Sequence, residues 1–212
     1  MPAVRLLSAD LGNGYCKIKT GNKRFTYPSV VAVEDDTLRG FAAKGLSSNH
    51  DYVIEFNDKR WAIGDTVYSN GLMPITIQDR SRITTEFYKV LFAAGLAIGI
   101  GQSSEVHPVV SLPPLAFFDK DIQQASLSGE YVVKWAGKTL TFDVPEKSME
   151  AVTEGFGTAA MFCLSAKGTI ANSDFFKQEI GIVDVGTLTT DFIRLSKMKL
   201  IRKGTDSIKH AL

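Results

Sequence analysis

Two short stretches of the sequence carry the residue types that suit phosphate chemistry, and they share one design. In each, an apolar run ends in an aspartate and a glycine follows two residues later: Asp10 and Gly12 in the first stretch, Asp184 and Gly186 in the second. A glycine permits a positive φ and a close approach of the backbone, so that amide N–H groups can point at an anion. This pattern indicates loops that hold phosphate groups.

Residues next to the glycines fit the same chemistry. An aspartate that faces a phosphate needs a cation between them, which indicates Mg²⁺ or a metal-bound water. Asn13 and Thr187 offer neutral donors, and Lys17 lies on the strand that leaves the first loop, where it can reach a phosphate as a point charge. One such turn is a weak signal. Two of them predict a duplicated fold in which a hairpin from each half binds one nucleotide.

Structural roles stay open for the same residues taken singly. Asp10 is as well suited to capping its own turn through an Asx-type hydrogen bond. Lys17 fits the solvent face of an alternating strand. Glu154 stands near the start of a predicted helix, where the helix dipole favours an acidic residue in any case. The three histidines are scattered and have no metal-ligand spacing.

The two loops need strands on either side to position them. Apolar residues at 4–9 predict a buried strand, and strands at 15–20 and 23–27, joined by a turn at Gly21-Asn22, complete a three-stranded meander. An apolar strand at 180–185 precedes the second loop and opens another strand pair.

The elements between the loops alternate in type. Residues 83–98 have apolar positions at helical spacing, with Thr84 or Thr85 as N-cap and Gly99 or Gly101 as the stop. The expected elements around this helix are a small β-rich insertion at 29–78 with a tight turn at Asn57-Asp58, a strand at 106–112, a short helix at 117–127, a hairpin around 136–138, a strand at 147–152 and a helix of small residues at 153–168. This order predicts a mixed α/β domain with helices packed on a sheet.

Composition narrows the function classes. The 212 residues contain 24 basic and 23 acidic side chains, and this balance argues against broad electrostatic binding to nucleic acid or to an acidic membrane. The longest apolar stretch, residues 90–100, is too short to span a bilayer. Two cysteines in apolar surroundings, with no signal-peptide pattern, predict reduced thiols in a cytoplasmic protein.

Three sequence runs resemble the actin-like ATPase superfamily. "DLGNGYCK" at 10–17 resembles its first phosphate loop, "DVGTLTTDF" at 184–192 its second, and "VTEGFGTAAM" at 152–161 its first connecting helix. The runs "SLPPLAFFD" at 111–119 and "KLIRKGTDSIKHAL" at 199–212 resemble plasmid-segregation actins of the ParM or StbA type. The resemblance extends in order over nearly the whole chain.

The resemblance implies an α/β fold of the actin-like, ribonuclease H-like kind. A mixed five-stranded sheet with flanking helices is expected from residues 1–28 and 79–178, with the small insertion subdomain at 29–78. Residues 179–212 are expected to begin a second domain of the same kind.

The resemblance also implies roles in the first loop. Asp10 would hold Mg²⁺ through water. Gly12, Asn13, Gly14 and Lys17 would contact the β-phosphate side of ATP, or of GTP in its place.

In the second loop, Asp184 would bind the metal or its water, and Gly186, Thr187 and Thr189 would line the γ-phosphate side. Glu154 matches the acidic residue that orients the attacking water. Together, Glu154 and Asp184 form the expected catalytic pair. Phosphoryl transfer to water needs little beyond such positioning and charge neutralisation.

Two departures from the family pattern matter. Thr187-Leu188 stands where the plasmid actins usually have Gly or Thr, and a side chain there crowds the γ-phosphate. The Gly-rich adenosine-binding segment of the second half does not follow residue 184. A truncated chain is expected, with a naturally short form as the alternative. Weak or no ATP binding and little polymerisation are therefore expected of the chain as given.

Three functions follow from the resemblance. The first is a bacterial ATPase that polymerises head to tail and segregates plasmids or other DNA through an adaptor protein, without direct DNA or membrane contact. The second is a short non-catalytic module that binds a partner or a filament end. The third is a sugar or acyl kinase of the same fold, for which no convincing catalytic aspartate is found in the first half.

Overall fold

The computed structural model of the chain describes residues 4–34, 52–165 and 167–210, and it divides into two compact units. Unit 1 contains Met1–Val110 and Asp121–Glu150, and unit 2 contains Ser111–Lys120 and Ala151–Leu212. The domain boundaries that the resemblance implies stay a prediction. Residues 35–51 of the expected insertion lie outside the described residues.

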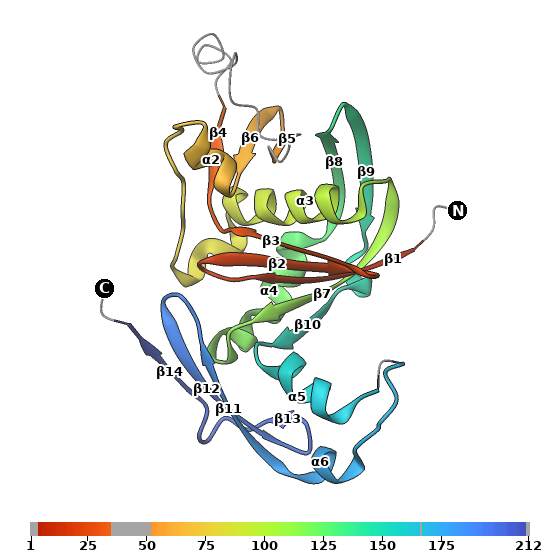
Figure 1. Cartoon of the computed structure of the whole chain (residues 1–212), viewed down its shortest axis with the longest axis vertical. Helices are drawn as coiled ribbons and strands as arrows, with labels where there is room; N and C mark the ends of the chain where they lie inside the picture. The colour runs from red at the N-terminus through yellow and green to blue at the C-terminus, as the bar shows by residue number, and fades with distance from the viewer. Residues whose placement is uncertain (1–3, 35–51, 166, 211–212) are drawn as a thin grey trace. The chain divides into compact units, whose positions relative to one another are not determined.

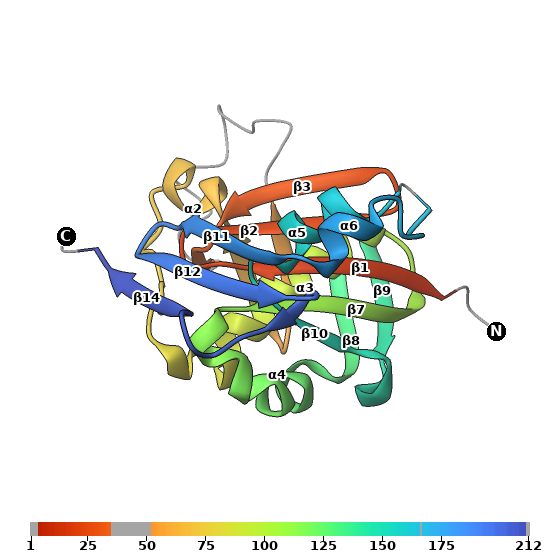
Figure 2. The ribbon, with the colours of Figure 1, turned by 90° about the horizontal axis from the view of Figure 1, so that it is seen from below.

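Unit 1 begins with the predicted meander. Strands β1 (Arg5–Leu11), β2 (Tyr15–Thr20) and β3 (Lys23–Pro28) pair antiparallel in sequence order (Figure 2). Alternate residues of β1, namely Leu7, Ala9 and Leu11, are buried. Strand β7 (Ser104–Leu112) lies parallel to β1, with Leu6 opposite His107. The predicted strands and the Gly21-Asn22 turn are confirmed.

The sheet continues beyond β7 through a hairpin and the insertion. The hairpin consists of β8 (Gly129–Trp135) and β9 (Lys138–Val144), and the insertion contributes β4 (Val31–Val33), β5 (Val53–Phe56) and β6 (Lys59–Ile63). The order is β3-β2-β1-β7-β9-β8-β5-β6-β4, and β10 (Glu150–Thr153) pairs with β7. The expected mixed five-stranded sheet corresponds to β3-β2-β1-β7 with β10. It extends to ten strands among the described residues because β9 pairs with β7 and β5 pairs with β8.

Helix α3 (Glu86–Ile100) is the core of unit 1. Nearly all its side chains are buried, as expected for a helix that is apolar on every side. It contacts strands from both ends of the sheet order, so the sheet curls around it (Figure 1). Thr85 is its N-cap and accepts a hydrogen bond from the Tyr88 N–H, and Gly101 ends it in the left-handed conformation. Gly99, the alternative stop, instead lies within the helix, packed against Ile18 of β2.

Short helices connect these strands: α2 (Asp65–Ser69), η2 (Arg80–Thr84), α4 (Lys120–Leu127) and η4 (Glu146–Ser148). Asn57 and Asp58 both have positive φ, which confirms the tight turn predicted there. The strand predicted at 147–152 is wrong in its first half. A 3₁₀ turn after Pro145 occupies residues 146–148, and β10 begins only at Glu150.

Unit 2 consists of η3 (Pro114–Asp119), α5 (Phe156–Cys163), α6 (Ser173–Lys177) and a sheet of four strands. The strands are β11 (Glu179–Val185), β12 (Thr189–Ser196), β13 (Lys199–Leu200) and β14 (Asp206–Lys209), with β12 paired to the other three. Its core gathers Ala159, Ile193 and Leu195. The helix predicted at 153–168 is shorter at both ends. Gly155, with φ of +76°, caps its start, and Leu164, in an extended conformation, ends it.

In the described part of the chain, no helix is both long and apolar enough to cross a membrane.

Candidate functional site

The first candidate loop is the tip of the β1–β2 hairpin, and it holds Asp10, Gly12, Asn13, Gly14 and Lys17. Asp10 and Lys17 are directly opposite one another in the strand register. The Lys17 Nζ lies 3.2 Å from the Asp10 Oδ2. The structure therefore brings the proposed metal ligand and the proposed phosphate-binding lysine together as a partly exposed ion pair.

Residue 12 has to be a glycine because the backbone of Tyr15 comes very close to it. A Cβ built at this position lies 2.9 Å from the carbonyl oxygen of Tyr15, closer than real Cβ atoms come to such an atom. Its φ lies outside the left-handed region, so the positive φ considered for this glycine is not the reason for it. The tight approach alone selects glycine here.

Two residues that no sequence pattern indicated, Ser29 and Arg82, donate hydrogen bonds to the backbone carbonyls of the first loop. The Ser29 hydroxyl donates to the Gly12 carbonyl at 2.6 Å, and the Ser29 N–H donates to the Gly14 carbonyl at 2.9 Å. The guanidinium of Arg82, on η2, donates to the same Gly12 carbonyl at 3.1 Å. Arg82 lies about 70 positions away in sequence, and no local pattern marks it.

Burial shapes the chemistry of Cys16, at the start of β2. Its Sγ lies 3.3 Å from the Ser29 Oγ. Burial raises the pKa of this thiol to about 12, although the hydrogen bond with Ser29 and the charge of Arg82 act in the opposite direction. Cys16 is therefore a protonated, unreactive packing residue beneath the loop.

The second candidate loop is the tip of the β11–β12 hairpin, which holds Asp184, Gly186, Thr187 and Thr189. The Gly186 N–H donates to the Thr189 carbonyl at 2.8 Å, and a Cβ at Gly186 would lie 3.2 Å from that same oxygen. The glycine of the second loop is thus placed like Gly12: each lies two residues after the aspartate and against the carbonyl of the residue three positions later.

A further carboxylate faces the second aspartate. Asp191 is directly opposite Asp184 in the strand register and is only 3% exposed. One of its oxygens accepts a hydrogen bond from the Thr189 hydroxyl at 3.0 Å, and the other is buried with no hydrogen-bond partner among the described residues. Like charges directly opposite on adjacent strands destabilise a sheet. The sequence run contained Asp191, but only the register shows that it faces Asp184.

Glu154 lies on the turn between β10 and α5, one residue before the helix cap. Its N–H donates to the Leu112 carbonyl at 2.8 Å. The next residue, Gly155, packs on the β11–β12 hairpin, since a Cβ there would lie 2.6 Å from Ile193 and 3.4 Å from Ile182. Unit 2 therefore brings Glu154 to the hairpin that carries Asp184.

Each loop, taken by itself, offers oxygen donors of the kind that Mg²⁺ binds. Asp10 and Asp184 are oxygen donors, and a buried, unsatisfied carboxylate oxygen accompanies Asp184. Among the described residues no group of three His, Cys, Asp or Glu side chains is placed to hold a metal. Mg²⁺ does not need one, because it usually binds one or two carboxylates and takes its other ligands from phosphates and water.

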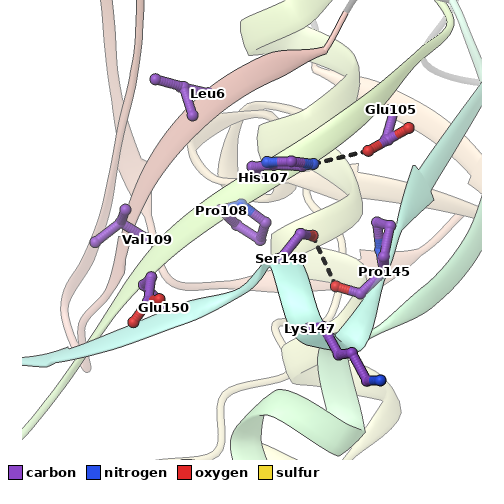
Figure 3. A pocket seen from close by; sticks show the side chains of 9 residues that line it. All are labelled: Leu6, Glu105, His107, Pro108, Val109, Pro145, Lys147, Ser148 and Glu150. Carbon is purple, nitrogen blue, oxygen red and sulfur yellow. Dashed lines mark hydrogen bonds and ion pairs between the residues drawn. The ribbon is translucent and has the colours of Figure 1, made fainter.

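A separate pocket of about 440 Å³ lies in unit 1 (Figure 3). In it the His107 Nε2 lies 2.7 Å from the Glu105 Oε1, and Leu6, Lys147 and Glu150 also line it. No residue of the first loop lines this pocket. Leu6 precedes Asp10 by four strand residues, or roughly 13 Å at the usual rise.

Comparison with known families gives one match. The family model for the N-terminal domain of actin-like proteins matches residues 8–157. No curated protein sequence matches the chain.

Solved structures show the fold. The apo ParM protein of pSK41 is 20% identical with a TM-score of 0.80, over 97% of this chain and 66% of that one. A ParM from a 15-stranded filament of Clostridium botulinum is 22% identical with a TM-score of 0.70, over 97% and 64%. AlfA from a filament bound to AMPPNP is 17% identical with a TM-score of 0.63, over 99% and 70%. The chain thus spans about two thirds of the length of these proteins.

Proposed function

Since the chain belongs to the actin-like protein family, we propose that it carries the phosphate-binding loops of an ATPase that binds ATP with Mg²⁺ and polymerises head to tail. GTP is the alternative nucleotide. The proposed biological role is the segregation of plasmids or other DNA, through a DNA-binding adaptor protein.

One observation carries the nucleotide proposal: two hairpins, far apart in sequence, are built alike. Each places an aspartate near the end of its first strand and a glycine two residues later, and each glycine lies close to a backbone carbonyl, at a distance that excludes a Cβ at Gly12 and leaves one little room at Gly186. A hairpin needs neither the aspartate nor this tight approach to turn. Both features suit a backbone that must come close to a phosphate.

In the first loop, Asp10 would hold Mg²⁺ through water. Gly12, Asn13 and Gly14 would approach the β-phosphate with their backbone, and Lys17 would supply positive charge. The ion pair between Lys17 and Asp10 supports these two roles, because it places a metal-binding carboxylate and a phosphate-binding ammonium group side by side in the same loop.

In the second loop, Asp184 would bind the metal or its water, and Gly186, Thr187 and Thr189 would line the γ-phosphate side. Glu154 would orient the attacking water. Magnesium would neutralise phosphate charge when bound. The opposed carboxylates of Asp184 and Asp191 support a cation at this loop, since a cation relieves their repulsion.

Assembly is supported by the fold. Two of the three solved structures described above come from filaments, one of ParM and one of AlfA. A head-to-tail contact joins two different surfaces and does not close on itself, which is the geometry that produces a filament.

Single-turnover release of phosphate, with the protein in excess over ATP, tests the proposed reaction at low activity. We expect slow, Mg²⁺-dependent release that falls about a hundredfold in Glu154→Gln, with nucleotide affinity unchanged. The matched control is Glu150→Gln, which removes an exposed carboxylate on the strand before the same turn.

The outcomes separate the candidate functions. Equal release by Glu154→Gln and the original chain removes Glu154 from the reaction. ATP consumption that requires an added sugar or acyl acceptor indicates the kinase. Nucleotide binding without hydrolysis and without pelleting on sedimentation indicates the non-catalytic module.

A further inference from the structure

Arg82 lies buried behind the first loop, on the short helix that leads from the insertion into α3. It is 6% exposed. Its Nη2 donates to the carbonyl oxygens of Leu11 at 3.0 Å and Gly12 at 3.1 Å, and its Nη1 donates to the Asn13 Oδ1 at 2.5 Å. One guanidinium therefore binds three consecutive residues of the loop.

These contacts fix which way the loop's peptide groups face. In a trans peptide the N–H points opposite to the C=O of the same plane. With the Leu11 and Gly12 carbonyls turned toward Arg82, the N–H groups of Gly12 and Asn13 point away from it. The Asn13 side chain is oriented in the same way, because its oxygen faces Arg82 and its amide nitrogen does not.

Arg82 itself is held in place from several sides. Its guanidinium lies over the rings of Phe87 and Tyr88, 5.6 Å and 5.3 Å from their centroids. Asp79 caps the helix η2 by accepting a hydrogen bond from the Ser81 N–H at 2.7 Å. A planar fork of donors is needed to reach three acceptors at once, and a lysine ammonium lacks that geometry.

We propose that Arg82 is a positioning residue for polyphosphate binding: it turns the carbonyls of the first loop inward, so that the N–H groups of Gly12 and Asn13 face the phosphates. This inference rests on the proposed function, since it assigns to Arg82 the preorganisation of that site. Donors fixed in advance bind an anion without the cost of reorganising the loop.

Two variants of Arg82 and one control variant, each made in the chain of 212 residues, test the proposal. Arg82→Gln and Arg82→Lys each lose the three-way fork, and Arg80→Gln removes an exposed arginine from the same helix. The probe is tripolyphosphate with Mg²⁺, titrated into each protein and followed by amide NMR. We expect affinity to fall about tenfold in both Arg82 variants, with Lys failing to rescue, and to stay unchanged in Arg80→Gln.

A second measurement needs no ligand. In the free protein, ¹⁵N relaxation of the Gly12 and Asn13 amides reports the order of the loop, and hydrogen exchange in α3 reports the stability of unit 1. We expect larger motion of both loop amides in the Arg82 variants and unchanged motion in Arg80→Gln, while exchange in α3 stays slow in all of them. Loss of protection throughout α3 would instead show that Arg82 serves only to stabilise unit 1, and this overturns the proposal.

The outcomes distinguish this inference from the proposed function. If the original chain binds tripolyphosphate and the Arg82 variants bind it within twofold of that affinity, the inference is overturned and the function stands. If the original chain binds no polyphosphate, the proposed function fails for this chain, and with it the role of Arg82 in binding. Larger loop motion in the variants would then show only that Arg82 orders the loop.

Discussion

At the scale of single residues, the two loops contain arrangements that lower the stability of the free protein and that a simple hairpin turn does not need. The Asp184 and Asp191 carboxylates oppose one another, and one Asp191 oxygen is buried without a hydrogen-bond partner among the described residues. Such an arrangement lowers stability in the absence of a cation. Residues that reduce stability in the free protein are expected where binding restores it.

Replacing Gly12 by alanine tests the tight approach in the first loop. The new Cβ would lie 2.9 Å from the Tyr15 carbonyl oxygen, so the backbone has to shift. We expect a loss of about 1–3 kcal/mol in the free energy of unfolding, measured by urea denaturation.

Gly157→Ala is the matched control. Gly157 lies exposed in α5, and a Cβ there meets nothing within 4 Å. Alanine is favoured over glycine inside a helix by about 0.5–1 kcal/mol, so this variant is expected to be slightly more stable than the original chain. Equal stability of Gly12→Ala and Gly157→Ala would show that the first loop has room for a side chain.

At the scale of elements, the connection η2 matters more than its length suggests, because it carries Arg82 to the first loop. Its N-cap, Asp79, has a lowered pKa, chiefly because of the hydrogen bonds from the Ser81 hydroxyl and the Ser81 N–H. The folded state therefore favours the carboxylate. The resulting stabilisation is present above the ordinary pKa of 3.8 and is lost as the pH falls through the lower value of the folded state.

Removing the cap should therefore have a pH-dependent effect. Asp79→Ala is expected to be less stable than the original chain at neutral pH, and the difference is expected to shrink as the pH falls below 3.8. Urea denaturation across this pH range measures it. Asp65→Ala is the control, because Asp65 begins α2 without a side-chain capping bond in that helix. A difference that is constant with pH would mean that the carboxylate does not act as the cap.

Short sequence patterns predicted correctly those turns and helix ends that depend only on neighbouring residues. The Asn57-Asp58 turn, the Thr85 cap and the Gly101 stop depend on neighbours in the sequence, and each is confirmed. The two errors in element bounds also have local physical causes. Pro145 starts a 3₁₀ turn where a strand was expected, and Gly155, in the left-handed conformation, delays the start of α5.

At the scale of the whole molecule, the sequence resemblance predicted the family and the fold, and both are confirmed by the family match and the solved structures. It did not predict how far the sheet extends, because the pairing of β5 with β8 joins residues about 80 positions apart. It missed Arg82 for the same reason. Contacts of this kind depend on the folded topology and leave no periodic trace in the sequence.

The roles of the individual loop residues stay predictions, and they share one physical premise. Both hairpins are taken to bind phosphate through Mg²⁺, although they belong to different units of the chain. The two loops therefore have to be tested together, with a method that reports each of them separately and that detects weak binding.

The most direct test is a titration of the isotope-labelled chain with ATP and Mg²⁺, followed through the amide signals of Gly12, Asn13, Gly186 and Thr187. We expect signals of both loops to shift with one common dissociation constant, to return when the metal is chelated, and to stay unshifted in Asp10→Asn and Asp184→Asn. Signals that remain in place up to millimolar nucleotide, or shifts confined to residues outside both loops, would contradict phosphate binding by these hairpins.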